Sequence, residues 1–437
     1  MVQVGFGVRD ISPKPGMQMP GGFFKRVGKG VRDPLLAVAC VLFDGDKALA
    51  VVGIDTLFVT KDTVAAARRG IRQSTRIPEE HVLIGASHTH SGGPVADCLG
   101  CDADPVYLEM LVQGIVGAVT EAWQSLHDAE IGVGTGREES ILFNRRFLMR
   151  DGREITHPGK PGTPHHGDIV HPAGPTDPDL GVLAARDRSG QLMGVVVCYA
   201  CHSTVVGGDL FSPDYAGYLR KHLQARYGMK LPVCFLLGPC GDVTQVDNMS
   251  IAREFGPEHA DMMGSKLAAE TVRTIGRMDW MRAVPLAVHS EEIPVPIRPD
   301  PDVDRERPPY GLGSGANIEP VYARERELVA RMRQQTPSVS CEVQALRIGP
   351  LGVVSNGAEY FCEYGLRIKK CSPFARTWVV TLANEWVGYV PTAQAFVAGG
   401  YEPRTARSSK LVPQAGQLIL ETSLRALRRV APEQKNR

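Results

Sequence analysis

Short apolar runs alternate with longer amphipathic stretches through roughly the first two-thirds of the chain. The short runs are rich in β-branched residues, which is typical of buried strands, and the longer stretches repeat their apolar positions at helical spacing. Strands and helices in alternation predict an α/β fold. The predicted strands are 35–43, 48–54, 82–86, 194–200 and 232–237, and the predicted helices are 60–74, 106–126, 215–227 and 258–277.

Two segments rich in Pro and Gly, 150–180 and 296–315, interrupt this pattern and predict long surface loops. The first segment contains several histidines, but their neighbours are Pro, Gly and Lys, so a solvated or lid-like loop is favoured over a metal site. The pattern resumes after residue 340, and 431–437 is expected to be a frayed tail. The histidines are His157, His165, His166 and His171, and the later predicted elements are strands 342–348, 352–355 and 377–382 and a helix over 415–429.

Composition excludes several classes of protein. The 437 residues are 43% hydrophobic and 22% charged, as in ordinary globular proteins, and a net charge of +1 gives no sequence-wide basic surface for nucleic acid. No apolar stretch has the length of a membrane span, and the N-terminal residues lack the pattern of a secretory signal. We therefore expect a cytoplasmic protein with reduced cysteines, no nucleic-acid partner and no stable membrane association.

Two histidines, His88 and His90, follow the predicted strand 82–86. In extended backbone alternate side chains share a face, so both imidazoles are expected to point the same way. Neutral imidazole is the commonest protein ligand for transition metals, although two polar histidines in a loop are the alternative.

Polar segments also follow two other predicted strands. Strand 194–200 precedes Cys201-His202-Ser203-Thr204, and strand 232–237 precedes the turn Gly238 to Thr244. Ligands of α/β proteins gather at the carboxyl ends of strands. Two such ends that carry histidine favour a metal site, with a buried, hydrogen-bonded His202 as the alternative.

Two cysteine pairs suggest other cofactors. Cys198-Tyr199-Ala200-Cys201-His202 matches the pattern for covalent haem attachment. Haem of that type is attached outside the cytoplasm, and the motif lies in a strand-like run, so haem is disfavoured. Cys98 and Cys101 have the spacing of half a zinc knuckle, but no second pair completes one.

Several motifs, in the same order over nearly the whole chain, resemble the catalytic domain of the neutral/alkaline (non-lysosomal) ceramidase family. The resemblance implies mixed β-sheets flanked by helices in a single ceramidase-like zinc hydrolase domain over 1–430. The family's C-terminal immunoglobulin-like domain is not expected, because the chain is too short to hold it. The motifs include 5–13, 87–93, 199–204, 212–218, 238–244, 356–361, 388–392 and 399–402.

The resemblance also implies one zinc ion with two histidine ligands, a glutamate and a tyrosine. Three protein ligands with an open position are usual in catalytic zinc sites, and a movable tyrosine would still admit water or substrate. Carried over by motif, the ligands are His88, His202, Glu359 and Tyr389.

Four further residues receive catalytic roles from the resemblance. His90 would lie beside the metal and move a proton or polarise the carbonyl, and Tyr401 would donate a hydrogen bond to the developing oxyanion. Arg145 would bind a carboxylate or oxyanion. Thr244 stands where the ceramidases have a serine proposed to take part in catalysis; its hydroxyl is kept, but its stiff χ1 favours a metal-hydroxide route over an acyl-enzyme.

Structural roles are the alternatives for some of these positions. Glu359 begins a helix-like run and is also suited to capping a helix, and Tyr389 and Tyr401 are also suited to ordinary half-buried packing. Turn or N-cap roles are favoured for Asp214 and Asp242. Asp55, which closes a strand, is expected to orient a zinc histidine.

The sequence therefore predicts a zinc-dependent hydrolase that cleaves a linear amide of a soluble small molecule rather than membrane ceramide. Asn-Gly-Ala before Glu359 departs from the proline-containing family motif, so the match there rests on fewer residues. An esterase or lactonase that uses the same zinc site is the alternative within hydrolysis. A non-catalytic metal- or ligand-binding protein is the alternative from another class.

Overall fold

Two five-stranded mixed sheets lie face to face in the computed structural model, which describes residues 1–299 and 318–432. Their strand orders are β5-β4-β3-β1-β6 and β15-β13-β12-β7-β17. The inner faces share one apolar core, in which Val51 and Leu83 of the first sheet meet Leu183 and Val196 of the second. The strands are β1 (Gln3–Asp10), β3 (Leu36–Phe43), β4 (Ala48–Ile54), β5 (Val82–Ala86), β6 (His127–Asp128), β7 (Glu130–Arg137), β12 (Asp179–Arg186), β13 (Leu192–Tyr199), β15 (Val233–Leu237) and β17 (Trp280–Met281).

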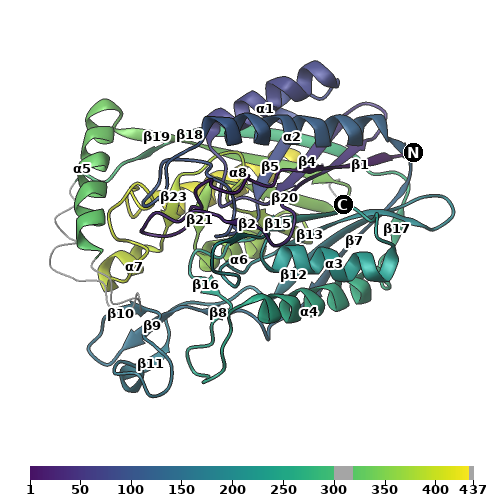
Figure 1. The fold of residues 1–437 in the computed structure, drawn as a ribbon. Helices are drawn as coiled ribbons and strands as arrows, with labels where there is room; N and C mark the ends of the chain where they lie inside the picture. The colour runs from purple at the N-terminus through teal and green to yellow at the C-terminus, as the bar shows by residue number, and fades with distance from the viewer. Residues whose placement is uncertain (300–317, 433–437) are drawn as a thin grey trace.

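Helices cover the outer face of each sheet (Figure 1). Helices α1 (Lys61–Ser74) and α2 (Pro105–Gln124) lie on the first sheet, and α3 (Tyr215–Tyr227) and α4 (Pro257–Ile275) lie on the second. Gly5 and Gly7 let α2 approach β1 closely, because a Cβ at either position would overlap the helix backbone. This layered arrangement confirms the predicted α/β class.

A third sheet, of order β18-β19-β20-β22, joins the edge of this assembly. Leu346, Val353 and Trp378 extend the shared core into it. Helix α8 packs against its other face. The elements are β18 (Leu286–Pro296), β19 (Ser338–Ile348), β20 (Leu351–Ser355), β22 (Arg376–Val380), α6 (Cys362–Cys371) and α8 (Ala415–Val430).

The remaining elements are short, apart from one helix. The segment 150–180, predicted as a long loop, contains two strands of a small sheet of order β10-β9-β11. Of the second predicted loop, residues 300–315 lie outside the described residues, as do residues 433–437 of the predicted tail. The elements are β2 (Gly30–Val31), β8 (Phe143–Asn144), β9 (Arg146–Met149), β10 (Glu154–Thr156), β11 (Ile169–Pro172), β14 (Leu210–Phe211), β16 (Val243–Thr244), β21 (Ala358–Tyr360), β23 (Gly388–Val390), α5 (Glu319–Gln335), α7 (Ala393–Ala398) and the 3-10 turns η1 (Glu79–His81) and η2 (His166–Asp168).

Within the described part of the chain, no helix combines the length and the apolar character that crossing a bilayer requires.

The carboxyl ends of β5, β13 and β15 meet at one place. Strands β4 and β5 run parallel, as do β13 and β15, so the segments that follow them emerge at the same edge of their sheets. Hydrogen bonds then join these segments: Ser203 Oγ donates to the Ser87 carbonyl at 2.7 Å, and His202 N donates to the Val243 carbonyl at 3.2 Å. The two sheets thus bring together segments that are far apart in the sequence.

We expect Gly53→Ala to destabilise the fold, because β4 passes so close to β15 that a Cβ at position 53 would overlap the carbonyl oxygen of Phe235. Overpacking of this kind costs about 1–3 kcal/mol, which lowers the melting temperature. The control is Gly167→Ala, where an added Cβ meets no atom within 4 Å. Equal melting temperatures for the two variants would contradict this account of how the sheets pack.

Candidate metal centre and active site

His88 and His90 lie beyond the end of β5, but not in the extended backbone predicted from their spacing. His88 has a φ of +64°. Left-handed backbone is uncommon for a residue other than glycine and is often found at functional sites. The two imidazoles meet because the chain turns sharply at His88: their ring centroids lie 4.9 Å apart, and that of His202 lies 4.3 Å from that of His88.

A backbone carbonyl fixes the tautomer of each of these three histidines. In every ring Nδ1 lies at hydrogen-bond distance from a carbonyl oxygen, which can only accept, so Nδ1 carries the proton. In the neutral form of each ring the lone pair is therefore on Nε2. The pairs are His88 with Leu57 at 2.7 Å, His202 with Cys240 at 3.0 Å, and His90 with Gly21 at 2.9 Å.

The Nε2 lone pairs converge on one buried point. His88 Nε2 and His202 Nε2 are 2.9 Å apart, and His90 Nε2 is buried without a hydrogen-bond partner in the described parts of the chain. Burial, with the neighbouring charge of Arg145, lowers the pKa of His202 well below its ordinary value, and burial next to His88 does the same to His90. A proton shared between these lone pairs is thus disfavoured, whereas a divalent cation between His88 and His202 would satisfy both of their Nε2 atoms and lie beside that of His90. Among the described residues, these three histidines are the group that could hold a metal ion.

Glu359 and Tyr389 face each other from two neighbouring parallel strands, β21 and β23, in which they are register partners. Glu359 Oε2 lies 3.4 Å from His88 Nε2, and Oε1 accepts a hydrogen bond from Trp386 Nε1 at 3.2 Å. Burial opposes ionisation of Glu359, but hydrogen bonds with Tyr389 and Trp386 favour the carboxylate, and its pKa lies below the ordinary value. Helix α6 begins only at Cys362, so the alternative role of Glu359 as a helix cap is wrong.

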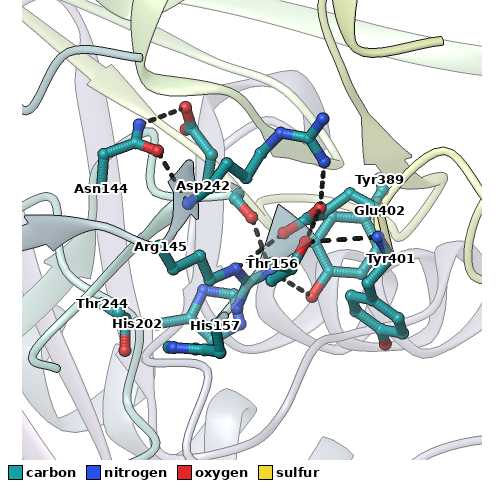
Figure 2. Close-up of polar contacts among 12 residues, drawn as sticks. Asn144, Arg145, Thr156, His157, His202, Asp242, Thr244, Tyr389, Tyr401 and Glu402 are labelled. Carbon is teal, nitrogen blue, oxygen red and sulfur yellow. Dashed lines mark hydrogen bonds and ion pairs between the residues drawn. The ribbon is translucent and has the colours of Figure 1, made fainter. Parts of the chain in front are cut away.

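Arg145 connects Tyr389 to a buried network of charges (Figure 2). Its Nη2 donates to Tyr389 Oη at 3.1 Å and to the Gly241 carbonyl at 2.7 Å, while its Nε donates to Glu402 Oε1 at 2.9 Å. Glu402 also pairs with Arg146. Burial disfavours the charge on Glu402, but the two arginines hold its pKa at about 2. The Nε and Nη2 donors of Arg145 thus already form hydrogen bonds within the protein.

The other predicted site residues lie around this centre. The ring of Tyr401 is 5.6 Å from that of Tyr389, and burial raises the pKa of its phenol. Thr244 is buried at the end of β16, where its hydroxyl donates to Gln245 Oε1 at 2.8 Å. In Figure 2 the hydroxyl of Thr244 points away from the tyrosines.

The three aspartates have structural contacts. Asp214 caps α3, and Asp242 accepts a hydrogen bond from the first backbone N–H of α6, as favoured from the sequence. Asp55 pairs with Arg220 instead of a histidine. Its expected role in orienting a zinc histidine is therefore wrong, because the Leu57 carbonyl orients His88.

Sequence reasoning missed Trp386, Glu402 and His157 as residues of this region. Trp386 is a single aromatic residue between motifs, and Glu402 stood in a recognised motif without an assigned role. His157 belongs to the segment predicted as a solvated loop, yet its backbone N–H donates to the Arg145 carbonyl at 2.8 Å and its Nδ1 lies 3.3 Å from Asn248 Oδ1. Of the other histidines of that segment, His165 and His171 are exposed.

The two cysteine pairs contribute no ligand to the candidate metal centre. Cys98, Cys101, Cys198 and Cys201 are all buried free thiols. Cys98 and Cys101 face each other across a short backbone bridge. Neither pair belongs to the group of possible metal ligands in the described residues.

The chain was compared with known proteins in sequence and in structure. No family model matches it. A neutral ceramidase of Pseudomonas aeruginosa is 23% identical over 397 residues, which cover 74% of this chain and 56% of that protein. The chain thus spans little more than half the length of that curated relative.

Two solved structures have the same fold. One, described as a ceramidase complexed with C2, has a TM-score of 0.75 at 19% identity and covers 99% of this chain and 76% of the other. The other, a neutral ceramidase from Pseudomonas aeruginosa, has a TM-score of 0.73 at 20% identity and covers 99% of this chain and 75% of the other. The resemblance found in the motifs is therefore confirmed: the chain is similar in sequence to the neutral ceramidases and shares their fold.

Proposed function

We propose that this protein is a zinc-dependent hydrolase that cleaves a linear amide (N-acyl) bond. The observation that carries the proposal is the convergence of His88 Nε2 and His202 Nε2, 2.9 Å apart, beside the carboxylate of Glu359. Nitrogen and oxygen ligands of this kind suit zinc. In this proposal His88, His202, Glu359 and Tyr389 hold the ion, which when bound supplies the Lewis acidity that polarises the amide carbonyl and activates water.

His90 is suited to move the proton in this reaction. The Gly21 carbonyl holds the proton on its Nδ1, and its Nε2 has no hydrogen-bond partner among the described residues. Since burial lowers its pKa, the imidazole is neutral at pH 7 and can accept a proton from the attacking water at Nε2. The same nitrogen can then return the proton to the departing amine.

Tyr401 is suited to stabilise the charge that develops on the carbonyl oxygen. Burial raises the pKa of its phenol above the ordinary value, so the hydroxyl keeps its proton at neutral pH and remains a donor. A fixed donor of this kind stabilises the transition state more than the ground state.

Amide hydrolysis is also supported by the similar proteins, because these are described as ceramidases and ceramide is an N-acyl amide. This chain departs from the ceramidase motifs at Thr244 and before Glu359, and we propose that it prefers soluble N-acyl amides to ceramide in membranes. Rates of hydrolysis of a soluble N-acyl amide and of ceramide in vesicles test this preference. Esters and lactones with the same acyl group test the alternative reactions.

We expect the purified protein to contain about one zinc ion per chain. His88→Ala and His202→Ala should both lose it, because each removes one of two adjoining nitrogen ligands. Elemental analysis measures the metal, and His127→Ala, at an exposed histidine, is the control that should keep it. A zinc-free wild-type protein, or zinc retained in both variants, would contradict the proposal.

Tyr401→Phe should lower kcat for an N-acyl amide by about 100- to 1000-fold and leave KM nearly unchanged, because one oxyanion donor is lost. Steady-state kinetics on a chromogenic N-acyl amide measure both constants. Tyr227→Phe, on the outer helix α3, should have wild-type kinetics. A Tyr401→Phe variant with an unchanged kcat would exclude this role.

Glu402→Gln should destabilise the protein by about 3–5 kcal/mol, because it leaves buried Arg145 and Arg146 without their shared partner. The folded-state pKa of Glu402, about 2, lies below the ordinary value of 4.5. Its stabilising effect is therefore complete above about pH 4.5 and lost as the pH falls toward 2. Melting temperatures of the variant and wild type should differ most near neutral pH and converge in acid, and exposed Glu363→Gln is the control. A constant difference down to pH 3 would contradict this assignment.

A further inference from the structure

Phe58 and Trp386 form a parallel aromatic stack next to the candidate metal centre. Their ring centroids are 4.1 Å apart and their planes differ by 5°. Phe58 follows β4 in the first sheet, whereas Trp386 precedes β23. The stack therefore connects two parts of the chain that are distant in sequence and that each contact a proposed metal ligand, His88 through Leu57 and Glu359 through Trp386.

Trp386 fixes the carboxylate of Glu359. An indole has a single hydrogen-bond donor, and here Nε1 donates it to Glu359 Oε1 at 3.2 Å. The terminal torsion of a glutamate has a broad energy minimum, so a bond to one oxygen decides where the other points. The other oxygen, Oε2, faces His88 Nε2.

Phe58 lies next to the residue that orients the second ligand, His88. The carbonyl of its neighbour Leu57 accepts from His88 Nδ1 at 2.7 Å and so keeps the lone pair of His88 on Nε2. Thr56 Oγ1 donates to the Phe58 carbonyl at 3.0 Å, which stabilises the turn that presents Leu57. Phe58 itself is 1% exposed, so its ring has little freedom to move.

Lys410 holds Trp386 in place as well. Its Nζ lies 5.2 Å from the centroid of the indole ring and donates to the carbonyls of Val387, at 2.6 Å, and Arg407, at 3.0 Å. A buried ammonium at this distance is attracted to an indole ring. Trp386 is thus held by the stack, by the ammonium and by its bond to Glu359.

We infer that the Phe58–Trp386 stack is a positioning unit that orients two metal ligands at once, Glu359 through the indole N–H and His88 through the Leu57 carbonyl. This inference rests on the proposed function, because it assumes that these two residues bind zinc. Partners that orient metal ligands in this way typically contribute 10- to 100-fold to metal affinity.

The first test is Trp386→Phe, which keeps an aromatic ring for the stack but removes the N–H donor. Zinc affinity of the full-length protein, stripped of metal by a chelator, is measured by competition with a chromophoric chelator. We expect the affinity to fall by about 10- to 100-fold. Trp123→Phe is the matched control, because Trp123 packs edge-on against Phe43 outside the centre and should keep wild-type affinity.

The second test separates positioning from general stability. In Co²⁺-loaded protein, visible absorption reports the geometry of the ligands, and we expect Trp386→Phe and Phe58→Leu to change this spectrum while Trp123→Phe leaves it unchanged. Because the two residues act as one unit, the double variant should lose less affinity than the product of the two single losses.

The outcomes distinguish this inference from the proposed function. A wild-type protein that binds one zinc ion, with Trp386→Phe binding it as tightly and with an unchanged Co²⁺ spectrum, would overturn the positioning role and leave the hydrolase proposal intact. A wild-type protein that binds no zinc would overturn both.

Discussion

Three imidazole lone pairs confined around one buried point are the constraint on which the rest of the site depends. Each ring of His88, His90 and His202 is turned inward by a bond from its Nδ1 to a backbone carbonyl. Backbone carbonyls cannot donate, so these bonds leave acceptors facing acceptors. Such an arrangement is costly in a folded protein unless a cation is bound there. The left-handed backbone at His88 adds to this local cost.

A chain of buried charges surrounds this point. From Tyr389 it passes through Arg145 to Glu402, and from there to Arg146 and Glu154. Buried ion pairs contribute little net stability, but removal of one partner is strongly destabilising. The network therefore does more to fix positions than to stabilise the fold: it holds the phenol of Tyr389 in register opposite Glu359.

The sequence predicted those parts of the molecule that follow from local pattern. Strands β4 and β5 and helix α3 have the predicted bounds, because each is a continuous run with one periodicity and clear ends. Helix α5 and strand β18 were missed: α5 is rich in charged residues, and the exposure of β18 gives it no apolar run.

Only part of the site could be predicted from the sequence. The polar segments at the strand ends correctly indicated that the chain after β5, β13 and β15 meets at one place. They could not indicate the left-handed turn at His88, since spacing alone implies extended backbone, nor the role of Trp386, whose partners Phe58 and Glu359 are distant in sequence. Such contacts arise from the packing of whole sheets, so no local pattern encodes them.

X-ray absorption at the zinc edge of the purified holoprotein tests the central claim most directly. The account predicts only nitrogen and oxygen neighbours, at about 2.0–2.1 Å, with the outer-shell scattering of imidazole rings. Sulfur neighbours at about 2.3 Å would place the metal on cysteines instead, and that result, or the absence of zinc, would contradict the account.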